Sequence, residues 1–530
     1  MPDVDVVVVG AGFAGLYMLH KLRGLGFSAR AFETGGGVGG TWYWNRYPGA
    51  RCDVESMEYS YNFDDDLQQE WEWTERYAPQ PEIEQYANHV ADRYDLRKDI
   101  TFNTKVTSAT FDEVSNAWTV TTDGGETVVA QFLVMATGCL SSANFPVIEG
   151  TETFAGETYH TGRWPQEGVD FEGKRVAVIG TGSSAIQSIP IIAEECAELT
   201  VFQRTANYAV PAWNAPIDPE YVKQTKATYN EFRAANRTMP AAFGSRMPAG
   251  TGQNVADFSD EEVREILDAR WNYGGLGFIG GFVDTILNPV ANEVVAEYVR
   301  EKIREIVKDP EVAELLAPDT VIGCKRLCVD TGYYATFNKD HVHLVDIRKS
   351  PIARITSQGV QTVDEESPVD IIVFATGFDA MIGALLAVDI KGRNGMPLRE
   401  AWDAGPRTYL GLGVVGFPNL FTITGPGSPS VLTNMMVSIQ QHVDWIGACI
   451  RHLRDNNIAT IEAEPQAQDE WVEFVNMMAN LTLFPSCNSW YLGANVPGKT
   501  RVFMPLLGYP TYEEKCDQVA ANNYEGFVLV

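Results

Sequence analysis

Two glycine-rich turns in this chain have the spacing of loops that bind a dinucleotide. The first turn contains Gly10, Gly12 and Gly15, and Glu33 follows about 20 residues later. Glycines at this spacing allow a tight turn and a close approach of the backbone to pyrophosphate, and an acid at that distance binds a ribose hydroxyl. The first turn therefore predicts a dinucleotide site rather than an ordinary glycine turn.

The second turn differs from the first at the position of the acid. It contains Gly180, Gly182 and Ala185, and Arg204 stands where the first unit has Glu33. A carboxylate there would repel a 2′-phosphate, whereas an arginine can bind one through charge-assisted hydrogen bonds. We therefore predict FAD at the first turn and NADP at the second; the alternative makes Arg204 an exposed cation at a strand end. The residues expected to contact NADP in this unit are Gly180, Gly182, Ser183, Ser184, Gln187, Arg204 and Thr205.

Apolar strands must hold both turns in place. Strands are predicted at residues 6–9, 27–32, 175–179 and 201–205, and two further strands close on Ala-Thr-Gly at 136–138 and 375–377, as in flavoproteins with two dinucleotides. The sequence predicts an α/β fold with two Rossmann-like domains, the NADP domain inserted in the FAD domain, and a helical subdomain with helices at 260–269 and 291–306. The expected bounds are 1–140 and 390–530 for the FAD domain, 150–212 and 321–389 for the NADP domain, and 213–320 for the helical subdomain.

The overall charge of the chain is strongly acidic. Among 530 residues there are 40 Lys and Arg against 70 Asp and Glu, a formal net charge of −30. Such a surface repels phosphate backbones and anionic lipids, so we expect neither nucleic-acid nor membrane partners. The N-terminus lacks the basic residues of a signal peptide, and no apolar stretch reaches membrane-spanning length. We expect a cytoplasmic protein.

The cysteines and histidines of the chain follow no metal-binding pattern. The eight cysteines include no CxxC pair, and His341 and His343 form the only close pair of histidines, without carboxylates at ligand spacing. We therefore expect no metal site. In a chain of this length, with the cysteines scattered, we also expect reduced thiols.

A longer motif lies between the two dinucleotide units. Residues 154–165 read FAGETYHTGRWP, and a second pattern runs from Gly39 through Trp42 and Pro48 to Asp53. In both patterns the chain resembles the Baeyer–Villiger monooxygenases, flavoenzymes that insert one oxygen atom beside a ketone carbonyl, and the resemblance covers essentially the whole chain. Within the family, segments 324–328, 428–435 and 490–495 are most similar to phenylacetone monooxygenases and then to cyclohexanone monooxygenases, which are shorter near 428–435.

The resemblance implies roles for individual residues. Arg326 matches the catalytic arginine of the family, and Asp53 matches the acid that pairs with it. Lys325 matches a second ligand of the NADP 2′-phosphate, and Trp490 lies in a segment that folds over NADP. His160 matches a histidine of the linker between the domains, so we expect a hinge role rather than acid–base chemistry. The resemblance further implies FAD contacts at Gly40, Thr41, Trp42 and Asp53, a ketone pocket at Val431, Leu432 and Met435, and a fingerprint built on Phe154, Gly156, His160 and Trp164.

The expected activity is the conversion of aryl-aliphatic or cyclic ketones to esters or lactones with NADPH and O₂. The resemblance implies a C4a-peroxyflavin stabilised by Arg326 and bound NADP, with sulfoxidation as a side activity. The partners would be the ketone and oxygen, and the protein a monomer or weak homo-oligomer. Two alternatives stay open. N-hydroxylating flavin monooxygenases carry a related motif, typically without the terminal Trp-Pro, and a reductase or oxidase would use the same cofactors without oxygenating a substrate.

Overall fold

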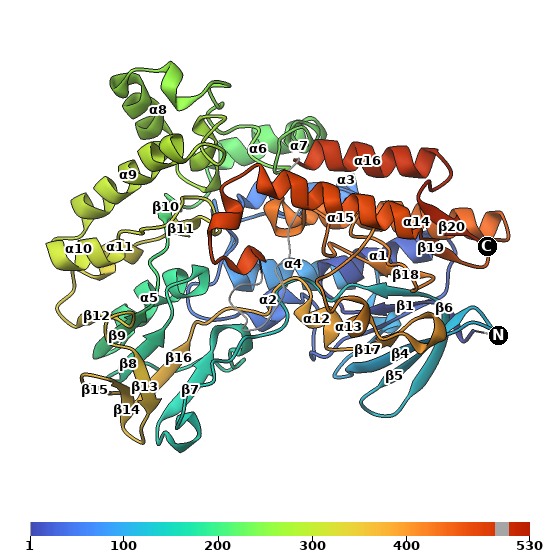
Figure 1. Cartoon of the computed structure of the whole chain (residues 1–530), viewed down its shortest axis with the longest axis horizontal. Helices are drawn as coiled ribbons and strands as arrows, with labels where there is room; N and C mark the ends of the chain where they lie inside the picture. Colours follow the sequence, from blue (N-terminus) through green and yellow to red (C-terminus); the bar gives the residue numbers. More distant parts are fainter. Residues whose placement is uncertain (1, 493–507) are drawn as a thin grey trace.

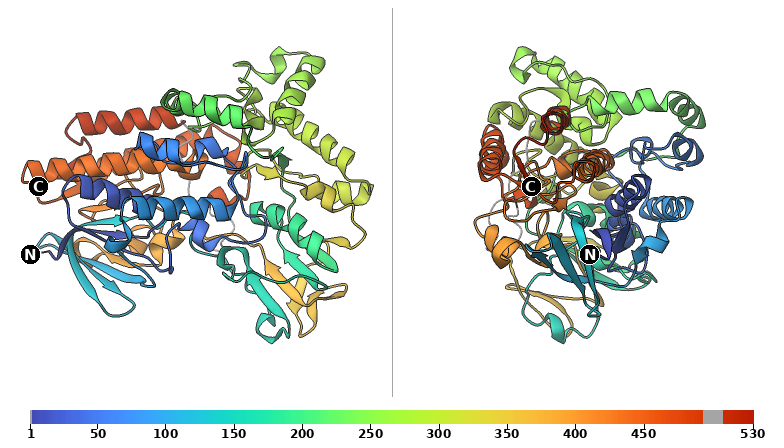
Figure 2. Two further views of the ribbon diagram at one scale, coloured as in Figure 1. Left: turned by 180° about the vertical axis from the view of Figure 1, so that it is seen from behind. Right: turned by 90° about the vertical axis from the view of Figure 1, so that its right-hand side faces the viewer.

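The computed structural model describes residues 2–492 and 508–530. Within these residues the chain forms two sheets that lie side by side, each flanked by helices, and a helical region above the second sheet (Figure 1). The view from behind shows the same arrangement, with the C-terminal helices above the first sheet (Figure 2, left). This is the α/β class with two dinucleotide-type units and a helical subdomain that the sequence predicts.

The first sheet is built on a buried run of valines. Val6, Val7 and Val8 are fully buried in β1, which pairs in parallel with β2 and β6. Within the described residues this sheet has eight strands in the order β17-β4-β5-β6-β1-β2-β3, with β18 paired to β6. Its strands are β1 (Val4–Val9), β2 (Ala29–Phe32), β3 (Ile100–Thr101), β4 (Val106–Asp112), β5 (Ala117–Thr122), β6 (Thr127–Met135), β17 (Asp389–Lys391) and β18 (Leu420–Thr422).

Helices cover both sides of the first sheet, and the C-terminal part of the chain adds a separate two-stranded antiparallel sheet. The helix α1 leaves the first glycine turn and packs against α14. The other helices of this part contribute to the same buried cluster or to its neighbour. They are α1 (Phe13–Gly24), α2 (Thr41–Trp44), α3 (Asp65–Glu70), α4 (Gln80–Arg93), α12 (Gly383–Leu386), α13 (Leu398–Ala401), α14 (Met435–Asp455), α15 (Pro465–Asn480) and α16 (Tyr509–Ala521), with β19 (Ile461–Ala463) paired to β20 (Phe527–Leu529).

The second sheet repeats the strand–turn–helix unit of the first. Its five described strands are all parallel, in the order β12-β9-β8-β16-β7, and the helix α5 follows β8. A three-stranded antiparallel sheet is appended to it. The elements are β7 (Glu157–His160), β8 (Arg175–Ile179), α5 (Ser183–Glu195), β9 (Glu198–Gln203), α11 (Tyr333–Thr336), β12 (Val342–Asp346), β13 (Ile352–Ile355), β14 (Gly359–Thr362), β15 (Glu366–Pro368) and β16 (Ile371–Phe374).

The region between β10 and β11 is helical, as its sequence indicates. The predicted helices at 260–269 and 291–306 are both present, and each has a side-chain N-cap: Ser259 for α8 and Asn288 for α9. Two short parallel strands frame the region. The elements are β10 (Ala209–Pro211), α6 (Pro219–Ala227), α7 (Tyr229–Arg237), α8 (Asp260–Tyr273), α9 (Pro289–Ile306), α10 (Pro310–Leu316) and β11 (Cys328–Asp330). Among the described residues, no helix combines the length and apolar character needed to cross a membrane.

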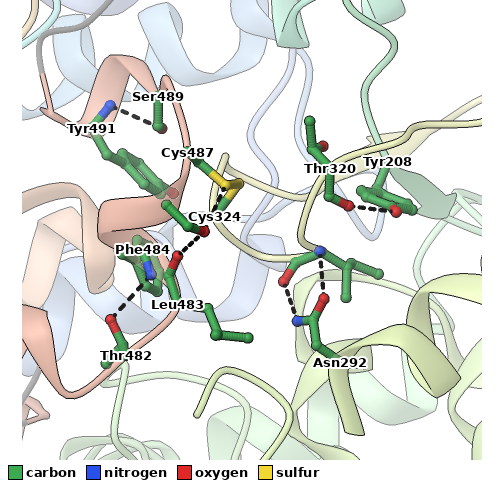
Figure 3. The surroundings of a disulfide bond; sticks show 12 residues. Tyr208, Asn292, Thr320, Cys324, Thr482, Leu483, Phe484, Cys487, Ser489 and Tyr491 are labelled. Atoms are coloured by element: carbon green, nitrogen blue, oxygen red, sulfur yellow. Dashed lines mark hydrogen bonds between the residues drawn. A yellow bond between two sulfur atoms is a disulfide. The ribbon is translucent and has the colours of Figure 1, made fainter. Parts of the chain in front are cut away.

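The expectation of reduced thiols throughout is wrong for two of the eight cysteines. Cys324 and Cys487 form a disulfide, with their Cα atoms 6.2 Å apart (Figure 3). The two residues are 163 positions apart, and spacing alone cannot reveal that the fold brings them together. Closing a loop of this length lowers the conformational entropy of the unfolded chain. In the chain-entropy model this loss stabilises the folded state by about 5 kcal/mol. The cysteines at 52, 139, 196, 328, 449 and 516 are free and buried.

Candidate active site

Both glycine turns have backbone geometry that requires glycine, and both rest on an Ala-Thr-Gly strand end. Gly10 has φ +107°, and a Cβ there would lie 2.6 Å from the Ala136 carbonyl oxygen. In the second unit Gly180 has φ +113°, and its Cβ would lie 2.5 Å from the Ala375 carbonyl oxygen. A Cβ on Gly15 would lie 2.0 Å from the Gly10 oxygen, so helix and strand approach more closely than any side chain allows.

The Glu33 carboxylate closes the first turn. Its two oxygens accept hydrogen bonds from the backbone N–H groups of Ala11, at 2.8 Å, and Gly35, at 2.7 Å. Burial raises the pKa of Glu33, and these backbone donors oppose that rise. Because each carboxylate oxygen has a second lone pair, Glu33 can still accept a ribose hydroxyl at this position.

The second fingerprint packs directly on the first turn. Gly40 has φ +55°, and a Cβ there would lie 2.9 Å from the Gly12 Cα. The two backbones therefore approach too closely for a side chain on either residue. Thr41 and Trp42 begin the helix α2 that follows, and the Trp42 indole donates to the Tyr59 hydroxyl at 3.0 Å. The segment 39–42 therefore extends the surface of the first turn, where we expect FAD.

The N-terminus of α5 faces open space. A Cβ added to Gly182 meets no atom within 4 Å, unlike a Cβ added to Gly180. Free N–H groups at a helix N-terminus bind phosphate, so this space fits a pyrophosphate. Two serines flank it: the Ser183 hydroxyl lies 3.3 Å from the Cys328 sulfur, and the Ser184 hydroxyl lies 3.1 Å from the Thr161 hydroxyl.

Gln187, predicted as an NADP contact, also forms hydrogen bonds between the two units. Its amide oxygen accepts from the Tyr47 hydroxyl at 2.8 Å, and its amide nitrogen donates to the Arg51 carbonyl at 3.1 Å. A Cβ on Gly49 would lie 2.2 Å from the Gln187 backbone oxygen, which explains the glycine of the second fingerprint. We therefore interpret Gln187 as a contact between the two dinucleotide units.

Two cations meet at the predicted 2′-phosphate position. Arg204 is exposed at the end of β9, and Lys325 is half-buried on the loop before β11. Burial lowers the pKa of Lys325, and the neighbouring Arg204 lowers it further. Two like charges held together favour an anion between them. Thr205 accepts from Thr181 through its backbone oxygen at 2.9 Å, which fixes the start of this segment.

Arg326 and Asp53 form a bidentate ion pair between the two units. The Arg326 Nε donates to Asp53 Oδ2 at 2.6 Å, and Nη2 donates to Oδ1 at 2.8 Å. The third nitrogen, Nη1, donates to the Val431 carbonyl at 2.7 Å. Burial alone would lower the pKa of Arg326, but the Asp53 carboxylate outweighs it and holds the pKa well above its usual value. The group is therefore a fixed positive charge, with side-chain exposures of 20% for Arg326 and 24% for Asp53.

Tyr491 is a member of this cluster that the sequence analysis does not assign. Its hydroxyl lies close enough to the Arg326 guanidinium for the two groups to shift each other's pKa, and the side chain is 4% exposed. Burial raises the pKa of Tyr491, while Arg326 opposes the rise. Tyr491 follows Trp490 directly in a segment that resembles the corresponding segment of the family. This position is the sequence feature from which Tyr491 could have been predicted as a site residue.

Apolar side chains surround the Arg326 cluster. Val431 is buried, and Leu432, Met435 and Trp490 are half-buried against the same core that contains Tyr491. The Trp490 ring lies 4.5 Å from the Tyr491 ring, centroid to centroid. Of the predicted pocket residues, Val431 contacts Arg326 through its carbonyl, and Leu432 and Met435 pack against the same hydrophobic cluster as Val431. Residues 493–495 of the predicted NADP-covering segment lie outside the described residues.

The fingerprint residues link the second sheet to the loops that enter and leave it. His160 is 2% exposed at the end of β7, its Nδ1 accepts from Gly162 N at 2.9 Å, and its Nε2 lies 3.2 Å from the Thr376 hydroxyl. Burial lowers the pKa of His160, which favours the neutral ring. A Cβ on Gly156 would lie 2.2 Å from the Asp370 oxygen. Phe154 packs against the core of this sheet and Trp164 is buried against Phe171. These contacts favour a structural role for His160 over acid–base chemistry, and the hinge role stays a prediction.

Comparison with known proteins identifies the family. A family model described as pyridine nucleotide-disulphide oxidoreductase matches residues 7–246. A protein of Pseudooceanicola batsensis named Baeyer–Villiger monooxygenase is 42% identical over 99% of this chain and 96% of its own length. The chain belongs to the Baeyer–Villiger monooxygenase family. The resemblance found in the two fingerprints is thus confirmed over the full length.

Solved structures of the family share the entire fold. A structure described as oxidized steroid monooxygenase bound to NADP is 50% identical, covers 99% of both chains, and has a TM-score of 0.95. A structure described as OTEMO in complex with FAD and NADP is 41% identical, covers 100% of both chains, and has a TM-score of 0.96. These similarities confirm the predicted fold class. The roles of the individual site residues stay predictions.

Proposed function

We propose that this chain is an FAD-containing Baeyer–Villiger monooxygenase that uses NADPH and O₂ to convert ketones to esters or lactones. The bidentate Arg326–Asp53 pair carries the proposal, because it fixes a cation, which also contacts the Val431 carbonyl, between the two dinucleotide units. Family membership supports it, as do the FAD and NADP named for related structures. We also propose that the domains that bind FAD and NADP have the bounds predicted from the sequence.

The residues of the chain would bind the cofactors and stabilise charge. When bound, FAD supplies the hydride acceptor and the centre that activates oxygen. Arg326 would stabilise the negative charge that develops on the ketone oxygen during attack at the carbonyl, and preorganised charge in a dry site is often the largest catalytic contribution. Asp53 would hold the guanidinium in place. Val431, Leu432 and Met435 would exclude water and contact the ketone.

Replacing Glu33 with glutamine is expected to weaken FAD binding by about 10- to 100-fold, the range expected for loss of one hydrogen bond to a charged group. The amide keeps the size of the side chain, but its NH₂ group would face a backbone donor at Ala11 or Gly35. FAD affinity would be measured by titrating the apoprotein. Glu126→Gln, which alters an exposed ion pair with Arg30 in the same sheet, is the control. Equal FAD affinity in both variants would contradict the assignment.

Replacing Arg204 with alanine is expected to raise the KM for NADPH by about 10- to 100-fold, because a charge-assisted contact to the 2′-phosphate is lost. The KM for NADH, which lacks that phosphate, is expected to stay unchanged. Steady-state NADPH and NADH oxidation measure both values on the same enzyme preparation. An equal rise for both nucleotides would make Arg204 a structural residue instead.

The proposed reaction is tested by its products. The enzyme is supplied with NADPH, isotope-labelled oxygen and one substrate at a time: a cyclic ketone, an aryl-aliphatic ketone, a sulfide and an amine. We expect labelled ester or lactone with one oxygen atom inserted per NADPH, and a labelled sulfoxide as a side product. Labelled hydroxylamine without ester would support the N-hydroxylating alternative. Hydrogen peroxide in place of every product would support an oxidase.

The same preparation, analysed by sedimentation, tests the proposed monomer or weak homo-oligomer.

A further inference from the structure

The loop that carries Lys325 and Arg326 is anchored on both sides of these residues. Before them, the Asn292 amide exchanges two hydrogen bonds with the Ile322 backbone, each of 3.0 Å, and the Tyr208 hydroxyl donates to the Thr320 carbonyl at 2.7 Å (Figure 3). After them, the Cys328 N–H donates to the Tyr208 carbonyl at 3.0 Å. Between these anchors, Cys324 is bonded covalently to Cys487.

The partner segment, residues 482–492, carries Trp490 and Tyr491. Its hydrogen bonds include several within the segment, such as Phe484 N to the Thr482 hydroxyl at 3.2 Å and Tyr491 N to the Ser489 hydroxyl at 3.2 Å (Figure 3). Its contacts with the rest of the protein include a hydrogen bond from Leu483 N to the Ile286 carbonyl at 2.9 Å, the packing of Phe484 and Tyr491 in a buried cluster, and the interaction of Tyr491 with Arg326. The disulfide adds a covalent link to these contacts.

We propose that the Cys324–Cys487 disulfide is a redox-controlled tether that sets the affinity of the site for NADP. The inference rests on the proposed function only in taking Lys325 and Arg326 as NADP contacts. Cys324 is one residue from Lys325, and Cys487 is four residues from Tyr491. The one bond therefore couples the phosphate-binding lysine, the central arginine and the segment that contacts it. Reduction removes the covalent link between the two segments, so NADP must hold them together against a larger loss of conformational freedom when it binds.

Reduction follows ordinary thiol–disulfide exchange with a dithiol reductant. One thiolate of the reductant attacks either sulfur, forms a mixed disulfide and displaces the other cysteine as a thiolate, which takes up a proton. The second thiol of the reductant then displaces the remaining cysteine. The protein gains two electrons and two protons, and the reductant becomes a cyclic disulfide. Because Cys324 is 1% exposed and Cys487 is 6% exposed, attack requires the segments to separate first.

Separation of the segments links the redox reaction to NADP. A ligand that needs both segments in place binds the oxidised form more tightly, and by thermodynamic reciprocity it stabilises the disulfide by the same factor. We expect about a tenfold difference in NADP⁺ affinity, within the usual range for two coupled sites. For a two-electron couple, a tenfold factor lowers the midpoint potential of the disulfide by about 30 mV at saturating NADP⁺.

The test measures both sides of this linkage on the intact FAD-loaded enzyme. Thiols in the denatured protein are counted by alkylation and mass spectrometry, with six expected in the oxidised form and eight in the reduced form. NADP⁺ affinity is measured by calorimetry for each form. The midpoint potential of the disulfide is measured in dithiothreitol redox buffers with NADP⁺, with NAD⁺ and without nucleotide. With NADP⁺ we expect a shift in the midpoint potential that matches the ratio of the NADP⁺ affinities of the oxidised and reduced forms. With NAD⁺ we expect a much smaller shift, because NAD⁺ lacks the 2′-phosphate that Lys325 would contact.

Variants and controls separate this role from a structural one. The double variant Cys324→Ser and Cys487→Ser is expected to bind NADP⁺ like the reduced wild type, whereas Cys449→Ser, a buried free cysteine on α14, is expected to bind like the oxidised form. If the double variant does not fold, the two wild-type forms still provide the comparison. Eight thiols after aerobic purification, or a midpoint independent of NADP⁺, would overturn the inference. If no substrate is oxygenated but the midpoint still shifts, the proposed function fails and the tether stands.

Discussion

Replacing Arg326 with alanine is expected to lower ketone oxygenation by about 10²–10³-fold or more, the cost of removing a preorganised group that stabilises a developing negative charge. The guanidinium is held by Asp53 and the Val431 carbonyl, and its pKa stays well above its usual value beside Asp53. No pH near neutrality removes that charge. Alanine leaves Asp53 without its bidentate partner and changes the net charge of the pair from zero to −1.

The measurement for this variant separates binding from oxygenation. Product formed per NADPH is measured together with FAD content and NADP⁺ affinity, and Arg326→Lys is compared because it keeps the charge but not the fork of two hydrogen bonds to Asp53. Arg97→Ala, which removes an exposed arginine–aspartate pair, is the matched control. Full oxygenation by the alanine variant would contradict the account and revive the N-hydroxylating alternative.

Replacing Asp53 with alanine is expected to reduce both turnover and stability. Breaking a largely buried ion pair by removing one partner leaves an uncompensated charge, and we expect a loss of about 2–3 kcal/mol, reduced from the value for a fully buried pair because both side chains are one-fifth to one-quarter exposed. Turnover is expected to fall by about 10- to 100-fold, because Arg326 keeps its charge but loses the contact that fixes its position.

Asp53→Asn distinguishes the charge of the side chain from its shape. Asparagine keeps one oxygen that can accept from the guanidinium, so its effect on the free energy of unfolding should be smaller than that of alanine. If the negative charge itself is needed during catalysis, both variants should lose turnover equally. Urea unfolding of the FAD-loaded enzyme and steady-state turnover measure the two effects. Wild-type turnover in both variants would show that Asp53 is only a turn residue.

The parts of the fold governed by local rules could be predicted from the sequence. The turns at Gly10 and Gly180 need a positive φ and leave no room for a side chain. A glycine at each of these positions therefore indicates the turn in the sequence. Buried strands such as β1 and β8 read as short β-branched runs next to those turns. Glu33 was found because its distance from the turn is fixed by one strand–helix–strand unit.

The contacts that the sequence analysis did not find join residues far apart in the chain. Cys324 and Cys487 are 163 residues apart, and neither is part of a recognisable pair pattern. Tyr491 contacts Arg326 across a similar separation, and Gln187, predicted as an NADP contact, also contacts Tyr47 and the Arg51 backbone. Such contacts depend on how the two units and the C-terminal segment pack together, and no local spacing encodes that packing.

The central claim is that the Arg326 site supports oxygen transfer, and one measurement tests it without knowledge of the natural ketone. The enzyme is reduced with one equivalent of NADPH and mixed with oxygenated buffer. The flavin absorbance is followed by stopped flow, and dissolved oxygen and hydrogen peroxide are measured over the same time course. The account predicts that oxygen is consumed well before the oxidised flavin spectrum returns, with a delay of many seconds while NADP⁺ stays bound. Immediate return of that spectrum with stoichiometric hydrogen peroxide would contradict it.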